Sequence, residues 1–363
     1  MHPLAPIIWV FLGVNKGEME FTIPVSPRIL KAVSRLDRLR GSWSATQAIS
    51  SDRLSRIEEA ARVQSVGASC RLAGIRLSDV EVAALLEGRG LTLRDSDQIR
   101  GYASAMTRPF PGEGEMLTCE TLRRLHAVLV GANADSISPW RESASHREAF
   151  DDEGRATGRI FSTLPPRWIS GKLEDLMTWF ELELRSGEHH PVLVIATLIL
   201  GLLAASPFDF GNGRLSRVLI GHLMRRAGYG YMPYASVEAQ MEELRDTYFE
   251  AFGHSQTRLW TGDARLEPWL EFFLQVLARH QQRVETKVRL EQASLAFPPL
   301  QQSIIEAVRE HGTVDAALLL KATGANRNTL KDNLRRLVER GVLEKSGQRR
   351  GTRYRISLGV ERA

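Results

Sequence analysis

The sequence predicts a mainly α-helical protein that ends in a small α/β domain. Apolar residues recur at spacings of three and four along segments such as LEDLMTWFELEL, and alternating, strand-like segments are rare before residue 297. Pro298 and Pro299 then interrupt the helical pattern, because proline disfavours helix at its own position and at the preceding residue. We therefore place a domain boundary at these two prolines.

Residues 1–25 are predicted to be an N-terminal extension. Their apolar run PLAPIIWVFLGV is too short to cross a bilayer, has no basic region before it and is not followed by a small-residue cleavage site. Met19 is an alternative start to Met1. Cys70 and Cys119 have neither zinc-ligand nor disulfide-framework spacing, which fits a reducing cytoplasm.

Two helical regions, 26–110 and 111–296, are expected before the boundary. Within the second, the run from Pro191 to Ala205 is apolar on all sides, with proline at the first helical position, which favours a buried central helix. The alternative, a membrane span, is disfavoured by its length and by the charged segments around it. Gly and Pro punctuate Gly154 to Pro166, which predicts a short β-hairpin.

The loop SPFDFGNGRLSR, Ser206 to Arg217, joins the apolar run to another amphipathic helix. Gly211 and Gly213 permit close approach of a ligand to the backbone, and the unpaired amides and dipole of a helix N-terminus attract an anion. Arg214 and Arg217 add bidentate donors, which suits a phosphate. The alternative is a tight turn that only caps the helix.

With Pro207 and Phe208, this loop resembles the signature HPFx[D/E]GNGRxxR of the Fic (Fic/Doc) family. The resemblance covers roughly residues 26–294, and it implies an all-helical Fic-like core, a β-hairpin flap and transfer of AMP from ATP to a hydroxyl of a target protein. It implies that Gly211, Asn212 and Gly213 form an anion hole, with Arg214 on the phosphate chain and Arg217 on the γ-phosphate. The flap residues that would align a target peptide are Gly158, Arg159, Ile160, Phe161, Ser162 and Thr163.

Two positions of the loop depart from the family pattern. Ser206 stands in the catalytic histidine position, and a serine without an adjacent base cannot deprotonate a hydroxyl near neutral pH, so we predict it to be inactive. Phe210 stands in the position of the acidic magnesium ligand and offers no oxygen, so Mg²⁺ binding is expected to be weak or absent. Asp209 could replace it only if the loop were shifted.

A third departure lies upstream, in the segment SCRLAG. Many Fic proteins carry an inhibitory helix with the pattern [S/T]xxxE[G/N], whose glutamate pairs with the second arginine of the loop. Here Ser69 and Gly74 keep the frame, but Ala73 replaces the glutamate. The resemblance therefore implies that the inhibitory contact is lost and that Arg217 lacks its usual internal partner. We interpret His126 and His222 as structural, and His189 and His190 as solvated residues or surrogate bases.

Residues 297–363 account for the net positive charge: thirteen Lys and Arg against seven Asp and Glu give +6, whereas the preceding residues sum to −1. Three helical segments end at Gly312, Gly324 and Gly341, and two short alternating segments surround Gly347 to Gly351. This order of elements is typical of a winged helix-turn-helix.

In the third of these helices, leucines at 330, 334 and 337 share one face with Val338 and are expected to pack inward. The opposite face would enter the major groove of DNA, and the wing would contact phosphates or the minor groove. The alternatives are a solvated basic surface and a protein-docking module. The DNA-binding residues that we predict are Arg327, Asn328, Lys331 and Arg335 on the helix, and Arg349, Arg350 and Arg353 on the wing.

Three functions fit these observations. The first is a catalytically impaired Fic-like protein that binds DNA, with ATP or a related nucleotide at its anion loop, and regulates transcription. The second is an active protein adenylyltransferase with a non-standard mechanism, and the third is a scaffold that pairs with another Fic protein. The partners expected are DNA, a protein target or partner, and a second copy of the chain in a homodimer; no membrane contact is expected.

Overall fold

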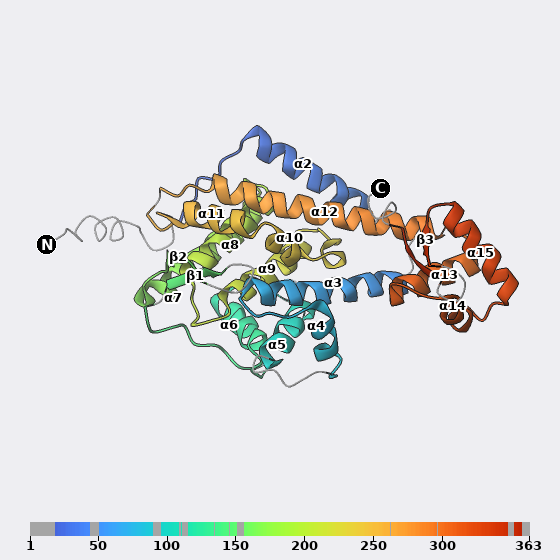
Figure 1. Ribbon diagram of the computed structural model, residues 1–363. Helices are drawn as coiled ribbons and strands as arrows, with labels where there is room; N and C mark the ends of the chain where they lie inside the picture. Colours follow the sequence, from blue (N-terminus) through green and yellow to red (C-terminus); the bar gives the residue numbers. More distant parts are fainter. Residues whose placement is uncertain are drawn as a thin grey trace. The chain divides into compact units, whose positions relative to one another are not determined.

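The computed structural model is mainly α-helical, as the sequence predicts, with few strands (Figure 1). It describes residues 19–43, 51–89, 96–108, 110, 115–133, 135–144, 146–150, 156–261, 263–295, 297–347 and 352–357. Most of the N-terminal extension, together with Arg349 and Arg350, lies outside these residues. The chain divides into two compact units, one of residues 1–44 and 56–281 and the other of residues 45–55 and 282–363.

The first unit is built almost entirely of helices, several of which begin at a capping side chain. Ser26, Ser78 and Thr118 each accept a hydrogen bond from a backbone amide of the first turn, which satisfies a donor that the helix itself leaves open. Helices α3 and α12 contribute residues to both units. The elements up to the end of α12 are α2 Pro27–Ser42, α3 Ser51–Leu72, α4 Asp79–Leu86, α5 Ser96–Thr107, α6 Cys119–Leu129, β1 His146–Phe150, β2 Ala156–Ser162, α7 Pro166–Ser186, α8 Pro191–Ala205, α9 Asn212–Arg226, the 3₁₀ turn η2 Met232–Tyr234, α10 Val237–Glu243, α11 Arg245–Gln256 and α12 Glu267–Leu295.

Helix α8 is the centre of this unit. Every residue from Val192 to Ala205 is buried, which confirms the prediction of a central core helix. The neighbouring helices in sequence, α7 and α9, both pack against it, and the indole nitrogen of Trp269 donates to the Ala196 carbonyl at 2.7 Å. Within the described ranges, no helix combines the length and the hydropathy needed to cross a membrane.

The β-hairpin lies slightly earlier in the chain than the sequence indicates. Strands β1 and β2 pair antiparallel, with His146 opposite Ser162 and Phe150 opposite Ala156. The first strand, HREAF, lies before the Gly and Pro residues that we used to place the hairpin. It contains a single residue of high strand propensity, so its extended conformation depends on pairing with β2 rather than on its own composition.

The second unit has its own apolar core, made by three short helices and a β-hairpin. As predicted, Gly312 and Gly324 end the first two helices with positive φ, and β3 pairs antiparallel with β4. Its elements are α13 Pro299–His311, α14 Ala316–Thr323, α15 Arg327–Glu339, β3 Leu343–Ser346 and β4 Arg353–Ile356. Its buried apolar residues are Ile304, Ile305, Ala307, Val308, Val314, Leu319, Leu330, Leu334, Leu337 and Leu343.

Two helical glycines allow a matched test of helix packing. A Cβ at Gly101, in α5, would lie 2.5 Å from the Val128 carbonyl oxygen, whereas a Cβ at Gly171, in α7, would meet nothing within 4 Å. We expect Gly101→Ala to lower the free energy of unfolding by about 3 kcal/mol, because backbone atoms of α6 cannot yield easily. We expect Gly171→Ala to raise it by about 0.5–1 kcal/mol through helix propensity.

Chemical denaturation of the two variants and the wild type would measure both changes. Equal effects of the two substitutions would contradict the close approach of α5 and α6.

Candidate anion-binding site

The loop between α8 and α9 begins at Ser206, which adopts a left-handed conformation with φ 44° and ψ 64°. This conformation is uncommon for residues other than glycine. The Ser206 amide donates to the Leu202 carbonyl at 2.9 Å and its hydroxyl donates to the Leu203 carbonyl at 2.8 Å. The side chain is buried, and its proton is engaged in ending α8.

Asn212 closes the loop through its side chain. Its Oδ1 accepts from the Phe208 amide at 3.0 Å, and its Nδ2 donates to the Phe208 carbonyl at 2.7 Å. Gly211 between them has φ 80°, and a Cβ there would lie 3.1 Å from Nε2 of His126. No side chain caps the N-terminus of α9, so its first amides face the loop. The Asn212 side chain is thus structural, and the helix N-terminus can attract an anion.

His126 supports the loop from α6. Its ring stacks on that of Phe208 at 3.7 Å between centroids, and Nε2 lies 3.0 Å from the Phe210 carbonyl oxygen. Burial lowers the pKa of His126 to about 4, so the ring is neutral at pH 7. Nε2 therefore carries the proton and donates to Phe210, while Nδ1 accepts from the Ser138 hydroxyl at 2.8 Å.

Arg141 ties the loop to the segment that follows β2. Its Nε donates to the Ser206 carbonyl at 2.7 Å, and its Nη2 donates to the Thr163 hydroxyl at 3.0 Å and to the Leu164 carbonyl. The Arg141 amide donates to the Pro207 carbonyl at 2.9 Å. This buried guanidinium fixes the backbone on both sides of the serine.

The loop forms one wall of a cavity of about 300 Å³. Three aromatic residues of α11 form another wall, and Phe161 of β2 packs on them, with ring centroids 6.0 Å from Phe249 and 5.0 Å from Phe252. The cavity therefore combines polar loop groups with an aromatic surface. Its lining residues are Leu72, Ala73, Ile75, Phe161, Leu203, Ser206, Phe210, Gly211, Asn212, Gly213, Arg214, Arg217, Tyr248, Phe249 and Phe252.

The two arginines of α9 reach this cavity while bonded to neighbouring helices. Arg214 donates to Oε1 of Gln98 at 2.5 Å. Arg217 donates through Nε to the Ser69 hydroxyl at 3.0 Å and through Nη2 to the Ser69 carbonyl at 3.2 Å. Ser69, and not a glutamate, is therefore the side chain that holds Arg217. Ala73 lines the cavity just beyond the last residue of α3, and Gly74 follows it with φ 82°.

The charge of Arg217 is balanced through hydroxyl groups. The Tyr102 hydroxyl contacts the Ser69 hydroxyl and donates to Oε1 of Glu238 at 2.7 Å. Burial and the neighbouring Glu238 carboxylate raise the pKa of Tyr102 well above its usual value, so it stays protonated. Among the residues that the structure describes, no carboxylate lies within 4.0 Å of Arg217. The neutral Ser69 and Tyr102 thus separate Arg217 from Glu238.

The site offers no set of ligands for magnesium. Phe210 is 49% exposed and presents only its ring at the cavity. Asp209 is exposed, interacts electrostatically with Arg141 and does not line the cavity. The described residues contain no group of three or more His, Cys, Asp or Glu side chains arranged to hold a metal ion. The residues present therefore do not fit a Mg²⁺ ion at the position that the family resemblance assigns to it.

Several residues of the site were not singled out from the sequence. Arg141 lies in PWRES, and Tyr248, Phe249 and Phe252 lie in TYFEAF; both segments resemble the Fic family, but we assigned these residues no role. Gln98 lies in no such segment. Of the six flap residues, side chains are described for Phe161, Ser162 and Thr163 only. The two histidines before α8 do not line the cavity: His189 bonds to Glu183 at 2.9 Å and His190 to Asp37 at 3.1 Å.

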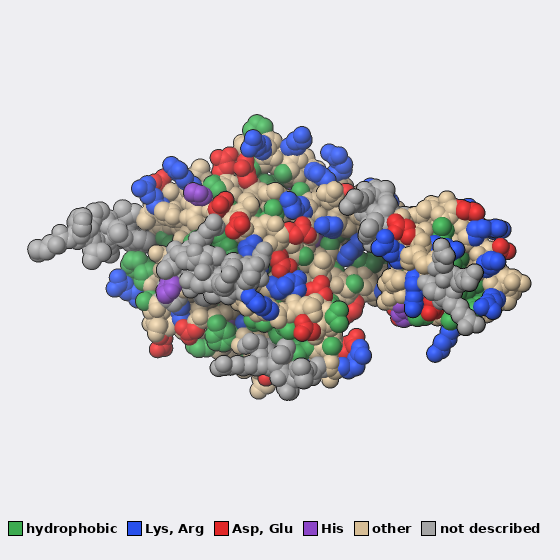
Figure 2. Space-filling view, viewed as in Figure 1, with side chains coloured by type: hydrophobic (Ala, Val, Ile, Leu, Met, Phe, Trp, Pro, Cys, Tyr) green, Lys and Arg blue, Asp and Glu red, His purple; other side chains and the backbone are tan. Residues whose placement is uncertain are grey.

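The second unit brings four of its predicted residues to one exposed helix face. Arg327, Asn328, Lys331 and Arg335 are all exposed on α15. Arg335 lies 3.5 Å from Asp332, and Arg353 of β4 lies 3.2 Å from Asp315. Figure 2 shows Lys and Arg side chains over the elements of this unit on the face in view.

Comparisons with known proteins find a family that is similar to this part of the chain. Residues 116–224, which include α6, α8 and most of α9, match the model of the Fic/DOC family. This part of the chain is similar to a Fic/DOC domain. It contains Ser206, the anion loop and both arginines of α9.

The wider comparisons agree with this assignment. Proteins named protein adenylyltransferase Fic from Culex quinquefasciatus and Aedes aegypti are each 28% identical to the chain over 209 residues, or 55% of its length. The chain spans 39% of the length of these curated relatives. A Fic family protein from Desulfovibrio desulfuricans G20 has the same fold at 18% identity, with a TM-score of 0.60, over 93% of this chain and 98% of its own. Fic-1 from C. elegans gives 0.53 at 18% identity, over 74% and 72%.

Two buried histidines within residues 116–224 predict a stability that depends on pH. Burial lowers the pKa of both His126 and His222 to about 4, below the value of about 6.5 expected in the unfolded chain. Each contribution to stability is full above pH 6.5 and declines as pH falls toward 4, because only the unfolded state takes up the proton. As the pH falls from 6.5 to 5, each histidine should lower the free energy of unfolding by about 2 kcal/mol.

Urea denaturation across this pH range would measure the slope of the free energy of unfolding against pH. His126→Gln and His222→Gln should each remove about half of it, and a slope unchanged in the double variant would contradict the assignment.

Proposed function

We propose that this chain is a nucleotide-binding Fic/DOC protein that has lost AMP transfer, and that its C-terminal unit binds DNA. The proposed loss of AMP transfer rests on the hydrogen bonding of Ser206, whose buried hydroxyl donates to the Leu203 carbonyl at 2.8 Å. A hydroxyl that donates its proton in this way cannot act as a general base at neutral pH, as an imidazole can.

The cavity has groups that suit both the phosphates and the base of a nucleotide. The uncapped N-terminus of α9 supplies amides and a dipole, and the buried guanidiniums of Arg214 and Arg217 supply charge. The aromatic wall of Phe161, Tyr248 and Phe249 supplies faces on which a base can stack. When bound, ATP would supply the AMP group that the curated relatives are named for transferring. In this chain the same groups would bind and orient it.

Among the residues that line the cavity, no side chain is a base that could take up the proton of an incoming hydroxyl. The His126 imidazole contacts the loop, but its Nε2 donates to the Phe210 carbonyl and its ring stacks on the ring of Phe208. Loss of a general base alone costs about a hundred- to ten-thousand-fold in rate. With Phe210 in place of a carboxylate beside the phosphates, the cavity retains binding groups and lacks reactive ones.

The second candidate is an active protein adenylyltransferase with a different base. The name of the curated relatives and the intact loop GNGRLSR favour it. Adenylate transfer by the wild-type chain to a protein, at a rate typical of enzymes, would establish this candidate in place of the first.

We expect ATP to bind the wild-type chain without turnover. Arg214→Gln should weaken binding about tenfold or more, because the phosphate loses a charge-assisted hydrogen bond worth about 1.5–3 kcal/mol. Isothermal titration would measure the affinity, and labelled ATP added to lysate would measure transfer. Arg124→Gln, an exposed arginine paired with Glu120 on α6, is a matched control that should bind as the wild type does.

A double variant, Ser206→His with Phe210→Asp, restores both missing groups in one chain. Histidine tolerates the left-handed conformation of residue 206, so the loop should keep its backbone. Transfer by this variant alone would support the proposal. Absence of ATP binding by the folded wild type would contradict it.

We further propose that the second unit is a winged helix and that α15 lies in the major groove of DNA. The order α13, α14, α15, β3, β4 supports this, since the third helix of such modules presents its polar face outward. Asn326 caps α15, which leaves Arg327 and Asn328 at the helix N-terminus where base edges are reached. A single α15 reads a short site, so two copies on adjacent half-sites are expected, with the Fic/DOC domain as a sensor.

We expect the full chain to bind duplex DNA with an affinity that falls steeply with salt. Neutralising Arg349 and Arg350 should weaken binding to all sequences alike and reduce the slope of log K against log[salt] by about 2, because two phosphate contacts are lost. Lys331→Gln tests the α15 contact, and Arg124→Gln is again the control. Fluorescence anisotropy at several salt concentrations would measure the slope. Absence of a complex would contradict DNA binding, and a complex whose affinity does not change with salt would contradict the phosphate contacts.

A further inference from the structure

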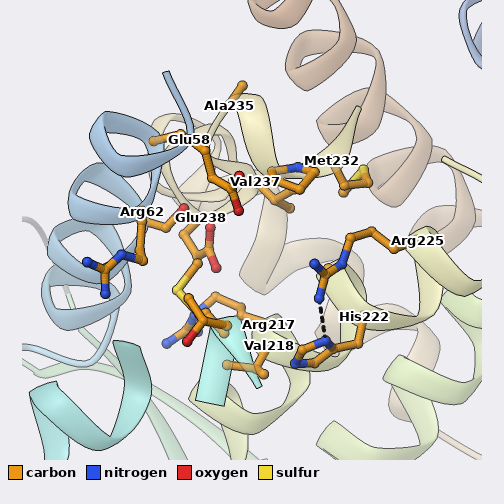
Figure 3. A pocket seen from close by; sticks show the side chains of 16 residues that line it. Glu58, Arg62, Arg217, Val218, His222, Arg225, Met232, Ala235, Val237 and Glu238 are labelled. Carbon is orange, nitrogen blue, oxygen red and sulfur yellow. Dashed lines mark hydrogen bonds between the residues drawn. The ribbon is translucent and has the colours of Figure 1, made fainter. Parts of the chain in front are cut away.

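A second cavity, of about 70 Å³, lies in the first unit and shares only Arg217 with the anion site. It is enclosed by side chains of α3, α5, α9, η2 and α10, and Figure 3 shows it from close by. Since one water-sized sphere needs about 10–15 Å³, the cavity has room for about five to seven non-hydrogen atoms. Only a small ligand fits.

The charged groups of this cavity stand on opposite sides. In Figure 3 the carboxylates of Glu58 and Glu238 lie together on one side, and the guanidinium of Arg225 points inward from the other. Arg62 at the rim is engaged by Glu59 through bonds of 2.9 and 2.7 Å. The cavity therefore presents an anionic side and a cationic side.

Arg225 is held in its position by a neutral partner. Its Nη2 donates to Nδ1 of His222 at 2.9 Å, and Nε2 of His222 donates to the Ala105 carbonyl at 2.8 Å, which fixes the tautomer. Within the described ranges, Arg225 has no carboxylate within 4.0 Å. The rest of its donor fork faces the cavity, and such a fork matches a carboxylate.

The anionic side is also without a cation. Glu238 is only 4% exposed, and its oxygens accept from the Tyr102 hydroxyl at 2.7 Å and the Ser236 hydroxyl at 3.2 Å. No Lys or Arg of the described chain forms an ion pair with Glu238 or with the exposed Glu58 at the mouth. Glu238 is linked to Arg217 only through Tyr102 and Ser69, so an ammonium group between the two carboxylates would add a direct charge partner.

We propose that this cavity binds a small α-amino acid in its zwitterionic form. The ligand's carboxylate lies on Arg225, and its ammonium group faces Glu58 and Glu238. A hydrogen or methyl side chain contacts the apolar wall of Val218, Met232 and Val237. Glycine and alanine, with five and six non-hydrogen atoms, match the volume.

The charges distinguish this ligand class from a simple anion. Arg217 is balanced by Glu238 through Ser69 and Tyr102, and Arg225 and Glu58 add one charge of each sign. A net-neutral cavity with separated charges favours a net-neutral ligand with separated charges, whereas inorganic phosphate would face two carboxylates.

Titration calorimetry on the full chain tests the proposal with five probes: glycine, L-alanine, acetate, methylammonium and L-tryptophan. We expect saturable binding of the first two only, since acetate and methylammonium each engage one side and tryptophan exceeds the volume. Arg225→Gln and Glu58→Gln should each weaken L-alanine binding at least about tenfold, by loss of one charge-assisted hydrogen bond.

Both substituted residues are exposed, so the variants should melt as the wild type does. Glu120→Gln and Arg124→Gln, an exposed ion pair on α6 that does not line the cavity, should bind L-alanine normally. The proposal is overturned if neither glycine nor L-alanine saturates the folded wild type, or if acetate or L-tryptophan binds as tightly as L-alanine. It is equally overturned if both cavity variants keep wild-type affinity.

Discussion

The paired hydrogen bonds between the Asn212 side chain and the Phe208 backbone are the constraint on which the site depends. They close a turn whose ends are two packed helices, so the first amides of α9 keep a fixed direction. Because a buried amide side chain without its partners would be costly, the turn cannot open without disturbing the core. Preorganisation of this kind lets a loop bind an anion without ordering itself first.

Two other buried side chains of the first unit also hold the loop in place. Arg141 fixes the backbone at Ser206 from one side, and His126 fixes the carbonyl of Phe210 from the other. Both are buried, and neither faces the cavity as a reactive group. The geometry of the loop is therefore kept by residues outside the loop itself.

The sequence predicted most of the helical fold because its signals are local. The apolar run of α8 and the glycines that end α13 and α14 each act through neighbouring residues, and all are found where expected. The position of β1 was missed, since a strand without marked propensity depends on its partner. The link from Arg217 through Ser69 and Tyr102 to Glu238 joins residues up to 148 positions apart, and no spacing in a single sequence reveals it.

The way in which Arg217 is held also bears on how readily the pocket accepts an incoming polyphosphate. A carboxylate on the same chain would behave as a tethered competitor, present at a high local concentration and attracted by full charge. The hydroxyl and carbonyl oxygens of Ser69 compete far more weakly, because both are neutral. The guanidinium gains hydrogen-bond strength when it exchanges such an acceptor for an anionic one. In the nucleotide site that we propose, occupancy would therefore follow the nucleotide concentration of the surroundings directly.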